Sequence, residues 1–165
     1  MIIREAIPGD ATALIQLFNA LDRETDFMLF EPDERDISPA RQKELIESFA
    51  STSSQLLMVA EQDRKLVGFI GAQGGSAIRN RHSTLIAMGV LEAFWGQSIG
   101  RQLLEAQEAW AKAHGFHRLE LTVQVRNKRA RRLYEKCGFI YEGTKRDALI
   151  IDGDYVDECY MSKLI

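Results

Sequence analysis

The chain has 165 residues, which is enough for one domain that buries about two thirds of its unfolded surface, and no linker composition divides it. The net charge of −3 argues against a general nucleic-acid-binding protein. Because no long apolar run is present, neither a signal peptide nor a membrane span is predicted, and we expect a single domain over residues 1–165.

The first third of the chain predicts a short strand and two helices. Residues Ile2–Ala6 are expected to form the strand, and Gly9-Asp10 to cap an amphipathic helix that continues to about Leu21. Ser38-Pro39 is a typical helix start, so a second helix is expected from there to about Ala50.

Three strands are predicted next. Residues 55–61 and 66–72 form an antiparallel hairpin around Asp63-Arg64-Lys65. The segment Leu85–Leu91 is small or apolar at every position, which is typical of a strand covered on both faces. We therefore place this strand in the middle of the sheet.

A turn over residues 92–100 joins this strand to an amphipathic helix that begins at Arg101. The first N–H groups of a helix have no intrahelical acceptor, and the helix dipole adds about half a positive charge there, so such a turn can bind an anion. Gly96 and Gly100 would let the main chain approach the ligand, and Ser98 adds a small hydroxyl donor. Taken alone, the turn fits an ordinary strand-to-helix connection equally well.

The same pattern is then repeated. Residues 119–125 alternate as a strand does, and Asn127 is placed to cap a helix that continues to Lys136 and ends at Cys137-Gly138. Asn127 and Tyr134 are seven residues apart, so they lie within about 20° of each other around the helix axis and about 10 Å apart along it. One elongated ligand could contact both.

The last two strands are predicted at Phe139–Glu142 and within Ala148–Tyr160, joined through Asp152-Gly153-Asp154. The predicted order is strand, two helices, three strands, helix, strand, helix and two strands. This order indicates an α/β protein with a mixed sheet.

The cysteines and histidines predict no metal site. Cys137 and Cys159 form neither a ligand pattern nor a disulfide framework, which suits a reducing cytoplasm, and both are interpreted as packing residues. The three histidines lack acidic or thiolate neighbours.

Two motifs resemble the GNAT superfamily of acyl-CoA-dependent N-acetyltransferases. The first is Trp95-Gly96-Gln97-Ser98-Ile99-Gly100, which lies on the family's CoA-binding pattern of Gln or Arg, two residues, Gly, one residue, then Gly or Ala. Trp95 replaces the Gln or Arg, and Ser98 replaces the middle Gly. The second is Asn127, Ala130 and Leu133–Phe139, which resembles the family's Asn, Ala and Leu-Tyr-Glu-Lys-x-Gly-Phe pattern.

The resemblance implies one GNAT-like domain with a mixed sheet of six to seven strands, flanked by helices, whose central strands splay apart. Acetyl-CoA would lie as cosubstrate between residues 84–91 and 117–125. Its pantetheine would pair with the main chain of the first strand and contact Asn127, its pyrophosphate would rest on the N–H groups of the turn, and Lys136 would approach the outer phosphates. The implied cofactor-binding residues are Met88, Gly89, Val90, Trp95, Gly96, Gln97, Ser98, Ile99, Gly100, Arg101, Asn127 and Lys136.

The resemblance also implies that an amine attacks the thioester directly, with Tyr134 as the acid that protonates the leaving thiolate. The general base stays open. Protein-acetylating relatives carry Glu where this chain has Thr122, so a water relay or another carboxylate such as Glu92 must serve.

We expect a small primary amine, such as a polyamine or an amino acid, as the acceptor, without a nucleic-acid or membrane partner, and a homodimer stays open. The alternatives are a protein N-terminal or lysine acetyltransferase and a degenerate member that only binds acyl-CoA. By resemblance, the acidic loop at residues 22–36 borders the acceptor, and its acidic residues would steer a cation: Asp22, Glu24, Asp26 and Glu31. The other interpretation is a solvated loop whose apolar centre simply packs down: Phe27, Met28 and Phe30.

Overall fold

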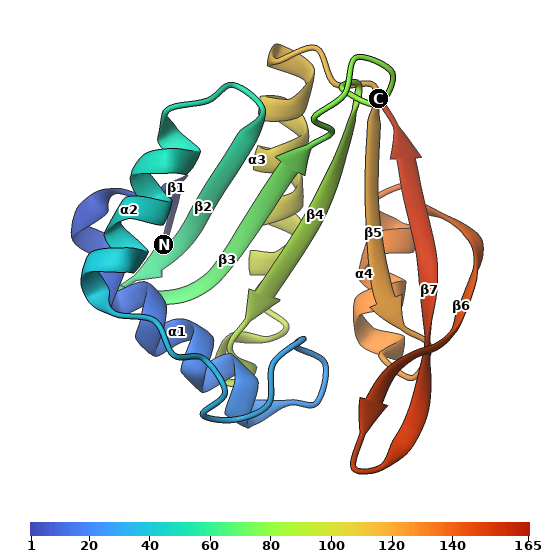
Figure 1. The fold of residues 1–165 in the computed structure, drawn as a ribbon, viewed down its shortest axis with the longest axis horizontal. Helices are drawn as coiled ribbons and strands as arrows, with labels where there is room; N and C mark the ends of the chain where they lie inside the picture. The colour runs from blue at the N-terminus through green and yellow to red at the C-terminus, as the bar shows by residue number, and fades with distance from the viewer.

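The elements follow the predicted order. A computed structural model describes all 165 residues, and the chain forms one seven-stranded sheet in the strand order β1-β2-β3-β4-β5-β7-β6 (Figure 1). The strands are β1 (Ile2–Glu5), β2 (Gln55–Gln62), β3 (Lys65–Gly74), β4 (Ser83–Val90), β5 (Arg118–Gln124), β6 (Ile140–Ile151) and β7 (Asp154–Leu164). The helices are α1 (Ala11–Glu24), α2 (Pro39–Ala50), α3 (Ile99–Ala113) and α4 (Lys128–Lys136).

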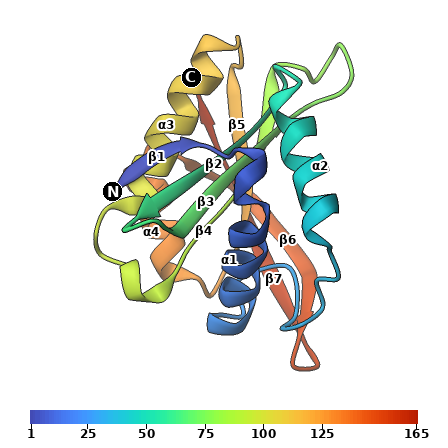
Figure 2. The same ribbon diagram turned by 90° about the vertical axis from the view of Figure 1, so that its left-hand side faces the viewer.

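The helices cover the two faces of the sheet unequally. Helices α1 and α2 pack on one face of β1–β4, and α3 packs on the other face (Figure 2). Helix α4 lies on the α3 side, against β5 and β7, so the opposite face of those strands has no helix over it (Figure 1). None of the helices has the length and apolar character that crossing a bilayer requires.

Local capping explains where α2 and α4 begin, whereas the cap expected from Asp10 at the start of α1 is not made, because its carboxylate accepts from Arg4 and from the Ile7 N–H instead. The Ser38 hydroxyl accepts the Arg41 N–H at 3.1 Å at the start of α2, with Pro39 in the first turn. The Asn127 side chain caps α4 by accepting the Ala130 N–H at 3.1 Å. Beyond α4, Gly138 adopts a φ of +90°, which confirms the predicted glycine at the helix end.

Two apolar clusters hold the layers together. The larger has 16 buried residues between the sheet and α3 with α4, and it includes Ile86, Leu103, Leu121 and Tyr134. The smaller has 8 buried residues under α1 and α2, where the Phe18 and Phe69 rings meet edge to face at 4.8 Å. The sheet is therefore anchored from both sides at β2 and β3, and less completely at β5–β7.

The centre of the sheet is split. Strands β4 and β5 run parallel and pair at only three positions, where Ser83–Leu85 face Arg118–Glu120. Beyond them β4 stays paired with β3 and β5 with β7, so the two central strands diverge (Figure 1). The expected splay of the central strands is present.

Two details of the predicted strands are wrong. Strand β4 is not covered on both faces, because Leu85 is 53% exposed and Ala87 is also exposed while Ile86 between them is buried. The last two strands are longer than predicted, since β6 runs unbroken to Ile151 and β7 to Leu164. A bulge between Lys145 and Leu149 shifts the register of β6, which interrupts the alternation that sequence reasoning relies on.

Candidate active site

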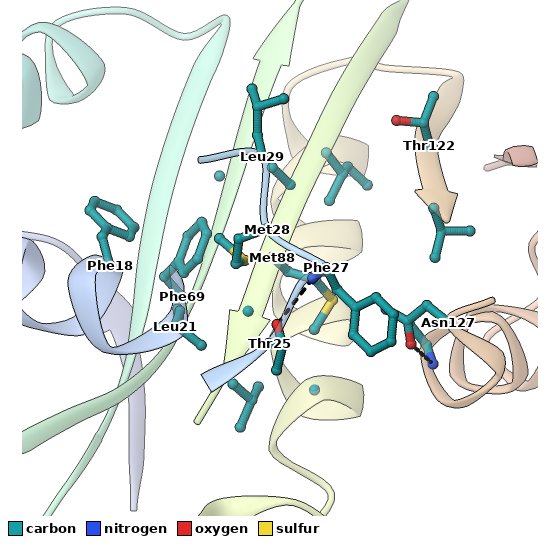
Figure 3. Close-up of a pocket in the computed structure, with 18 of the residues that line it drawn as sticks. Phe18, Leu21, Thr25, Phe27, Met28, Leu29, Phe69, Met88, Thr122 and Asn127 are labelled. Carbon is teal, nitrogen blue, oxygen red and sulfur yellow. Dashed lines mark hydrogen bonds between the residues drawn. The ribbon is translucent and has the colours of Figure 1, made fainter. Parts of the chain in front are cut away.

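The split in the sheet opens a cleft of about 1780 Å³. Its walls are β4 and the start of α3 on one side, and β5 and α4 on the other. The loop between α1 and α2 lies across it on the face that carries those two helices (Figure 3). Nearly all residues predicted to bind a cofactor line this cleft; the exception is Gln97, whose side chain turns away to the Ala93 carbonyl at 3.4 Å.

The register of β4 decides which of its main-chain groups face the cleft. Gly75 N–H donates to Ser83 O, and Leu91 N–H donates to Val67 O, both at 3.0 Å. Hydrogen-bonding direction alternates along an antiparallel strand, so Met88 and Val90 direct their N–H and C=O groups away from β3, into the gap. The Val90 carbonyl is already occupied by the Trp95 indole N–H at 2.7 Å. Both groups of Met88 and the N–H of Val90 stay unpaired.

The turn before α3 presents a row of unpaired donors. Gly96 and Ser98 adopt left-handed conformations with φ of +77° and +63°, and Gln102 N–H is the first to bond back into the helix, at 3.0 Å to Ser98 O. No acceptor in the chain meets the N–H groups of residues 96–101. This left-handed conformation explains why the motif prefers glycine at the position of Ser98. Serine can adopt the same conformation, but at a steric cost.

Gly100 is required by packing. A Cβ atom there would lie 2.9 Å from Leu133 Cδ2 and 3.2 Å from Met88 Cε. The absence of a side chain at Gly100 therefore lets the start of α3 approach both α4 and β4. The sequence predicts that Gly100 lets a bound anion come close. In the structure, the groups that lie close to Gly100 are the Leu133 and Met88 side chains.

Trp95 has a role that the motif did not reveal. Besides binding Val90, its ring lies under the Arg129 guanidinium, whose Cζ is 4.2 Å from the ring centroid. This cation–π contact joins the wall built by β4 to the wall built by α4. The tryptophan therefore fixes the mouth of the cleft at the end where α3 begins.

Helix α4 supplies more positive charge than sequence reasoning used. It carries five basic residues and one acidic residue among nine, which the sequence itself shows, whereas the family resemblance implied a phosphate contact for Lys136 alone in this helix. Such a rim suits phosphate groups. The basic side chains that line the cleft at this end are Arg101, Lys128, Arg129, Arg132 and Lys136.

Tyr134 and Asn127 both reach the cleft from α4. Tyr134 is 8% exposed and packs on Phe139, with ring centroids 5.8 Å apart, but no group in the chain hydrogen-bonds its hydroxyl. Burial raises the pKa of this phenol well above its ordinary value, so it keeps its proton. Asn127 uses its side-chain oxygen for the helix cap, which leaves its amide N–H₂ for a ligand.

The loop from Thr25 to Phe30 is tied to the end of β5. The Gln124 side-chain amide donates to the Asp26 carbonyl at 2.6 Å, and the Arg126 guanidinium lies 3.8 Å from the Asp26 carboxylate. Figure 3 shows the Phe27 ring between Met88 and Asn127. Leu29 is 72% exposed and lines the cleft, so the apolar centre of the loop forms a wall of the cleft instead of packing fully into the core.

The predicted set of steering carboxylates needs correction. The Asp22 side chain is 1% exposed and paired with Arg35, whose guanidinium lies over the Phe18 and Phe30 rings. Because its charge is already neutralised, Asp22 cannot attract a ligand. The remaining three lie closer to the surface: Glu24, which accepts the Glu92 N–H at 2.9 Å, Asp26, and Glu31.

No carboxylate named from the sequence is placed to act as a base. Thr122 lines the cleft, but Glu92 is exposed in the turn after β4 and lies outside the cleft. The carboxylates that line it are Glu34 and Asp36 of the loop and Glu158 of β7. Sequence reasoning missed Glu158 because the pairing of β7 with β5 is a long-range contact.

Cysteine chemistry has no support in the site. Cys137 is half-buried beside α3, and burial raises the pKa of its thiol, which disfavours the nucleophilic thiolate. Cys159 is buried in the core. No group of three or more potential ligand side chains forms a metal site.

Comparison with known proteins agrees with this geometry. The model of the Acetyltransferase (GNAT) family matches residues 15–139. The chain is 28% identical over 155 residues to the aminoglycoside N(6')-acetyltransferase type 1 of Stenotrophomonas maltophilia, covering 87% of this chain and 88% of the relative. It is 38% identical to the L-amino acid N-acetyltransferase AaaT of Escherichia coli (strain K12), over 64 residues that make up 39% of this chain and 38% of the relative.

Solved structures give the same picture. A GNAT-family acetyltransferase from Streptococcus pneumoniae is 33% identical and superposes with a TM-score of 0.96, covering 99% of both chains. A phosphinothricin acetyltransferase from Sinorhizobium meliloti in complex with acetyl-CoA superposes with a TM-score of 0.86 at 16% identity, covering 99% of this chain and 88% of that one, which shows likeness of fold alone.

Proposed function

The chain belongs to the GNAT family of acetyltransferases and is an acetyl-CoA-dependent N-acetyltransferase, and we propose that its acceptor is a small molecule with a primary amine. The observation that carries this proposal is the loop across the cleft. Because Gln124 of β5 donates to the Asp26 carbonyl, the loop is held across the face of the cleft from which an acceptor would enter. A peptide substrate needs an open groove along which its chain can extend, whereas a small amine needs only a pocket.

Acetyl-CoA would enter at the end of the cleft where α3 begins. The unpaired groups of Met88 and Val90 would bond the amides of the pantetheine, as a neighbouring strand would. The N–H groups of residues 97–101 would hold the pyrophosphate, and the basic rim of α4 would hold the outer phosphate. The N–H₂ of Asn127 would donate to the pantetheine.

In the chemical step, the amine nitrogen attacks the thioester carbonyl carbon, and the carbon–sulfur bond breaks. Tyr134 donates its hydroxyl proton to the sulfur and takes up the proton that the attacking nitrogen releases, so the thiol leaves neutral. No acyl-enzyme is formed, which agrees with the lack of a reactive cysteine. Burial keeps this phenol protonated, and because it takes up the proton of the nitrogen as it gives its own to the sulfur, it does not have to become a phenolate.

The named relatives support a small acceptor. Two of them carry small amines in their names, the aminoglycoside N(6')-acetyltransferase and the L-amino acid N-acetyltransferase. The exposed apolar side chains of the loop, above all Leu29 and Phe27, favour an amine that carries an apolar group over a bare polyamine.

Release of free CoA thiol from acetyl-CoA tests the proposal. The panel should contain spermidine, L-methionine, kanamycin and an alanine-initiated heptapeptide, each at several concentrations. We expect at least one of the three small amines to be turned over with a higher kcat/KM than the peptide. Turnover of the peptide alone would indicate a protein acetyltransferase, and tight acetyl-CoA binding without thiol release from any acceptor would indicate a binding module.

A further inference from the structure

We propose that Glu158 is the carboxylate that receives the ammonium group of the acceptor and removes its proton. This inference rests on the proposed function, because it concerns the acceptor side of the same cleft. It assigns a residue to the one chemical role that neither Thr122 nor Glu92 can fill.

The register of the sheet places Glu158 next to Thr122. Glu158 is directly opposite Gln124 on β5 and Lys145 on β6, and Thr122 is opposite Tyr160. Val125 N–H donates to Asp157 O at 3.0 Å, so Gln124 and Glu158 form a non-hydrogen-bonded pair whose side chains share one face. That face is the acceptor face, because the Gln124 amide reaches the loop there. Glu158 is thus a diagonal neighbour of Thr122, about 7 to 8 Å away.

The surroundings of Glu158 leave its carboxylate without a full set of partners. Its side chain is 14% exposed, yet the nearest cation, the Lys145 ammonium, is 4.0 Å away, which is too long for a hydrogen bond. No N–H or O–H group of the chain donates to it. A largely buried carboxylate is costly unless it is hydrogen-bonded, so this one is well suited to bind an added ammonium group.

Glu158 differs in this respect from the other two carboxylates of the cleft. Glu34 is exposed and accepts the Glu31 N–H at 2.7 Å, and Asp36 is exposed on the same loop. Glu158 stands on a strand that is paired on both sides, which fixes its position. The other charged or ionisable side chains that line the cleft are Arg35, Arg101, Arg126, Lys128, Arg129, Arg132, Tyr134, Lys136 and Lys145.

The proton balance of the reaction then closes. The ammonium transfers one proton to the Glu158 carboxylate, which passes it to solvent, and the neutral amine attacks the thioester carbonyl carbon. The second proton leaves the nitrogen of the adduct and reaches the CoA sulfur through Tyr134. One ammonium and one acetyl thioester thereby become one amide, one thiol and one solvent proton.

A pH profile of Glu158→Gln tests the inference. The measurement is kcat/KM between pH 6.5 and 9.5, with whichever of spermidine, L-methionine and kanamycin the wild-type enzyme turns over. We expect a loss of about 10²-fold at pH 7, because general-base catalysis contributes at least that much. The loss should shrink to less than about tenfold at pH 9.5, where solvent itself supplies the deprotonated amine. Acetyl-CoA affinity should stay within about twofold of wild type.

Two further variants serve as controls. Glu158→Asp retains a carboxylate, so it should keep the shape of the wild-type profile at a reduced rate. Glu142→Gln makes the same change in a carboxylate outside the cleft, which Arg118 and Ser162 already satisfy, and it should leave the profile unchanged. A Glu158→Gln deficit that is equal at every pH, or absent, would overturn the inference while leaving the proposed function intact. Failure of the wild-type enzyme to release thiol with any amine would overturn both.

Discussion

Replacing Tyr134 by Phe separates its chemical role from its role in packing. The ring is 8% exposed and belongs to the larger apolar cluster, so it would stay in place in the variant. The hydroxyl has no hydrogen-bond partner in the chain, and its removal therefore breaks no bond that stabilises the fold. We expect the free energy of unfolding to stay within about 1 kcal/mol of wild type. Acetyl-CoA affinity should also be unchanged.

Turnover should respond differently. If the phenol protonates the leaving sulfur, its loss should lower kcat by about 10²-fold or more, which corresponds to about 2.7 kcal/mol of transition-state stabilisation. Thiol release measured under single-turnover conditions isolates the chemical step, and calorimetry measures the acetyl-CoA affinity. Because burial raises the pKa of Tyr134 well above its ordinary value, its proton should not be lost between pH 7 and 10. Wild-type turnover in Tyr134→Phe, where chemistry limits the rate, would show that water protonates the thiolate.

Three further changes test the surroundings of the cleft. Gly100→Val forces a branched side chain against Leu133 and Met88, so it should cost about 1–3 kcal/mol of stability. It should also raise the acetyl-CoA Kd, measured by calorimetry, at least about tenfold. Unchanged affinity in a folded variant would contradict the assignment of this turn to phosphate binding. Arg118 and Ser162 lower the pKa of Glu142 to about 2, so the stability that this carboxylate contributes is complete above about pH 4.5 and lost as pH falls toward 2. The Tm difference between wild type and Glu142→Gln should shrink across that window, and a constant difference would show that charge is not its source. Gln107 is fully buried with no partner for its amide oxygen or nitrogen, so Gln107→Met should raise stability by about 1 kcal/mol or more in urea unfolding, whereas a lower midpoint would indicate an ordered water bound to the amide.

The parts of the fold that depend on local chemistry could be predicted from the sequence. Ser38 and Asn127 cap the helices that they were expected to cap, and Gly138 takes the left-handed conformation at the end of α4. These predictions succeed because a cap is decided by a few neighbouring residues. The order of elements and the family motifs followed from the same local patterns.

The features that depend on distant contacts could not be predicted. Leu85 still lies where β4 pairs with β5, yet its side chain is exposed and lines the cleft, whereas apolar composition alone suggested burial on both faces. In the sequence Asp22 resembles a free acidic residue, but in the structure it is paired with Arg35, which is 13 residues away. Glu158 became a candidate only through its pairing with Gln124, which is 34 positions earlier in the chain.

The three-residue contact between β4 and β5 also has a consequence for how the protein unfolds. The halves β1–β4 and β5–β7 share little direct strand pairing, so amide hydrogen exchange in the unliganded protein should reveal two units that open with different free energies. A ligand that contacts both halves would bind only the state in which both units are folded. At a concentration of 100 times its Kd, it would add about 2.7 kcal/mol to the stability of both units together. Acetyl-CoA would then act as a missing strand, and its cellular concentration would set how cooperatively the enzyme unfolds.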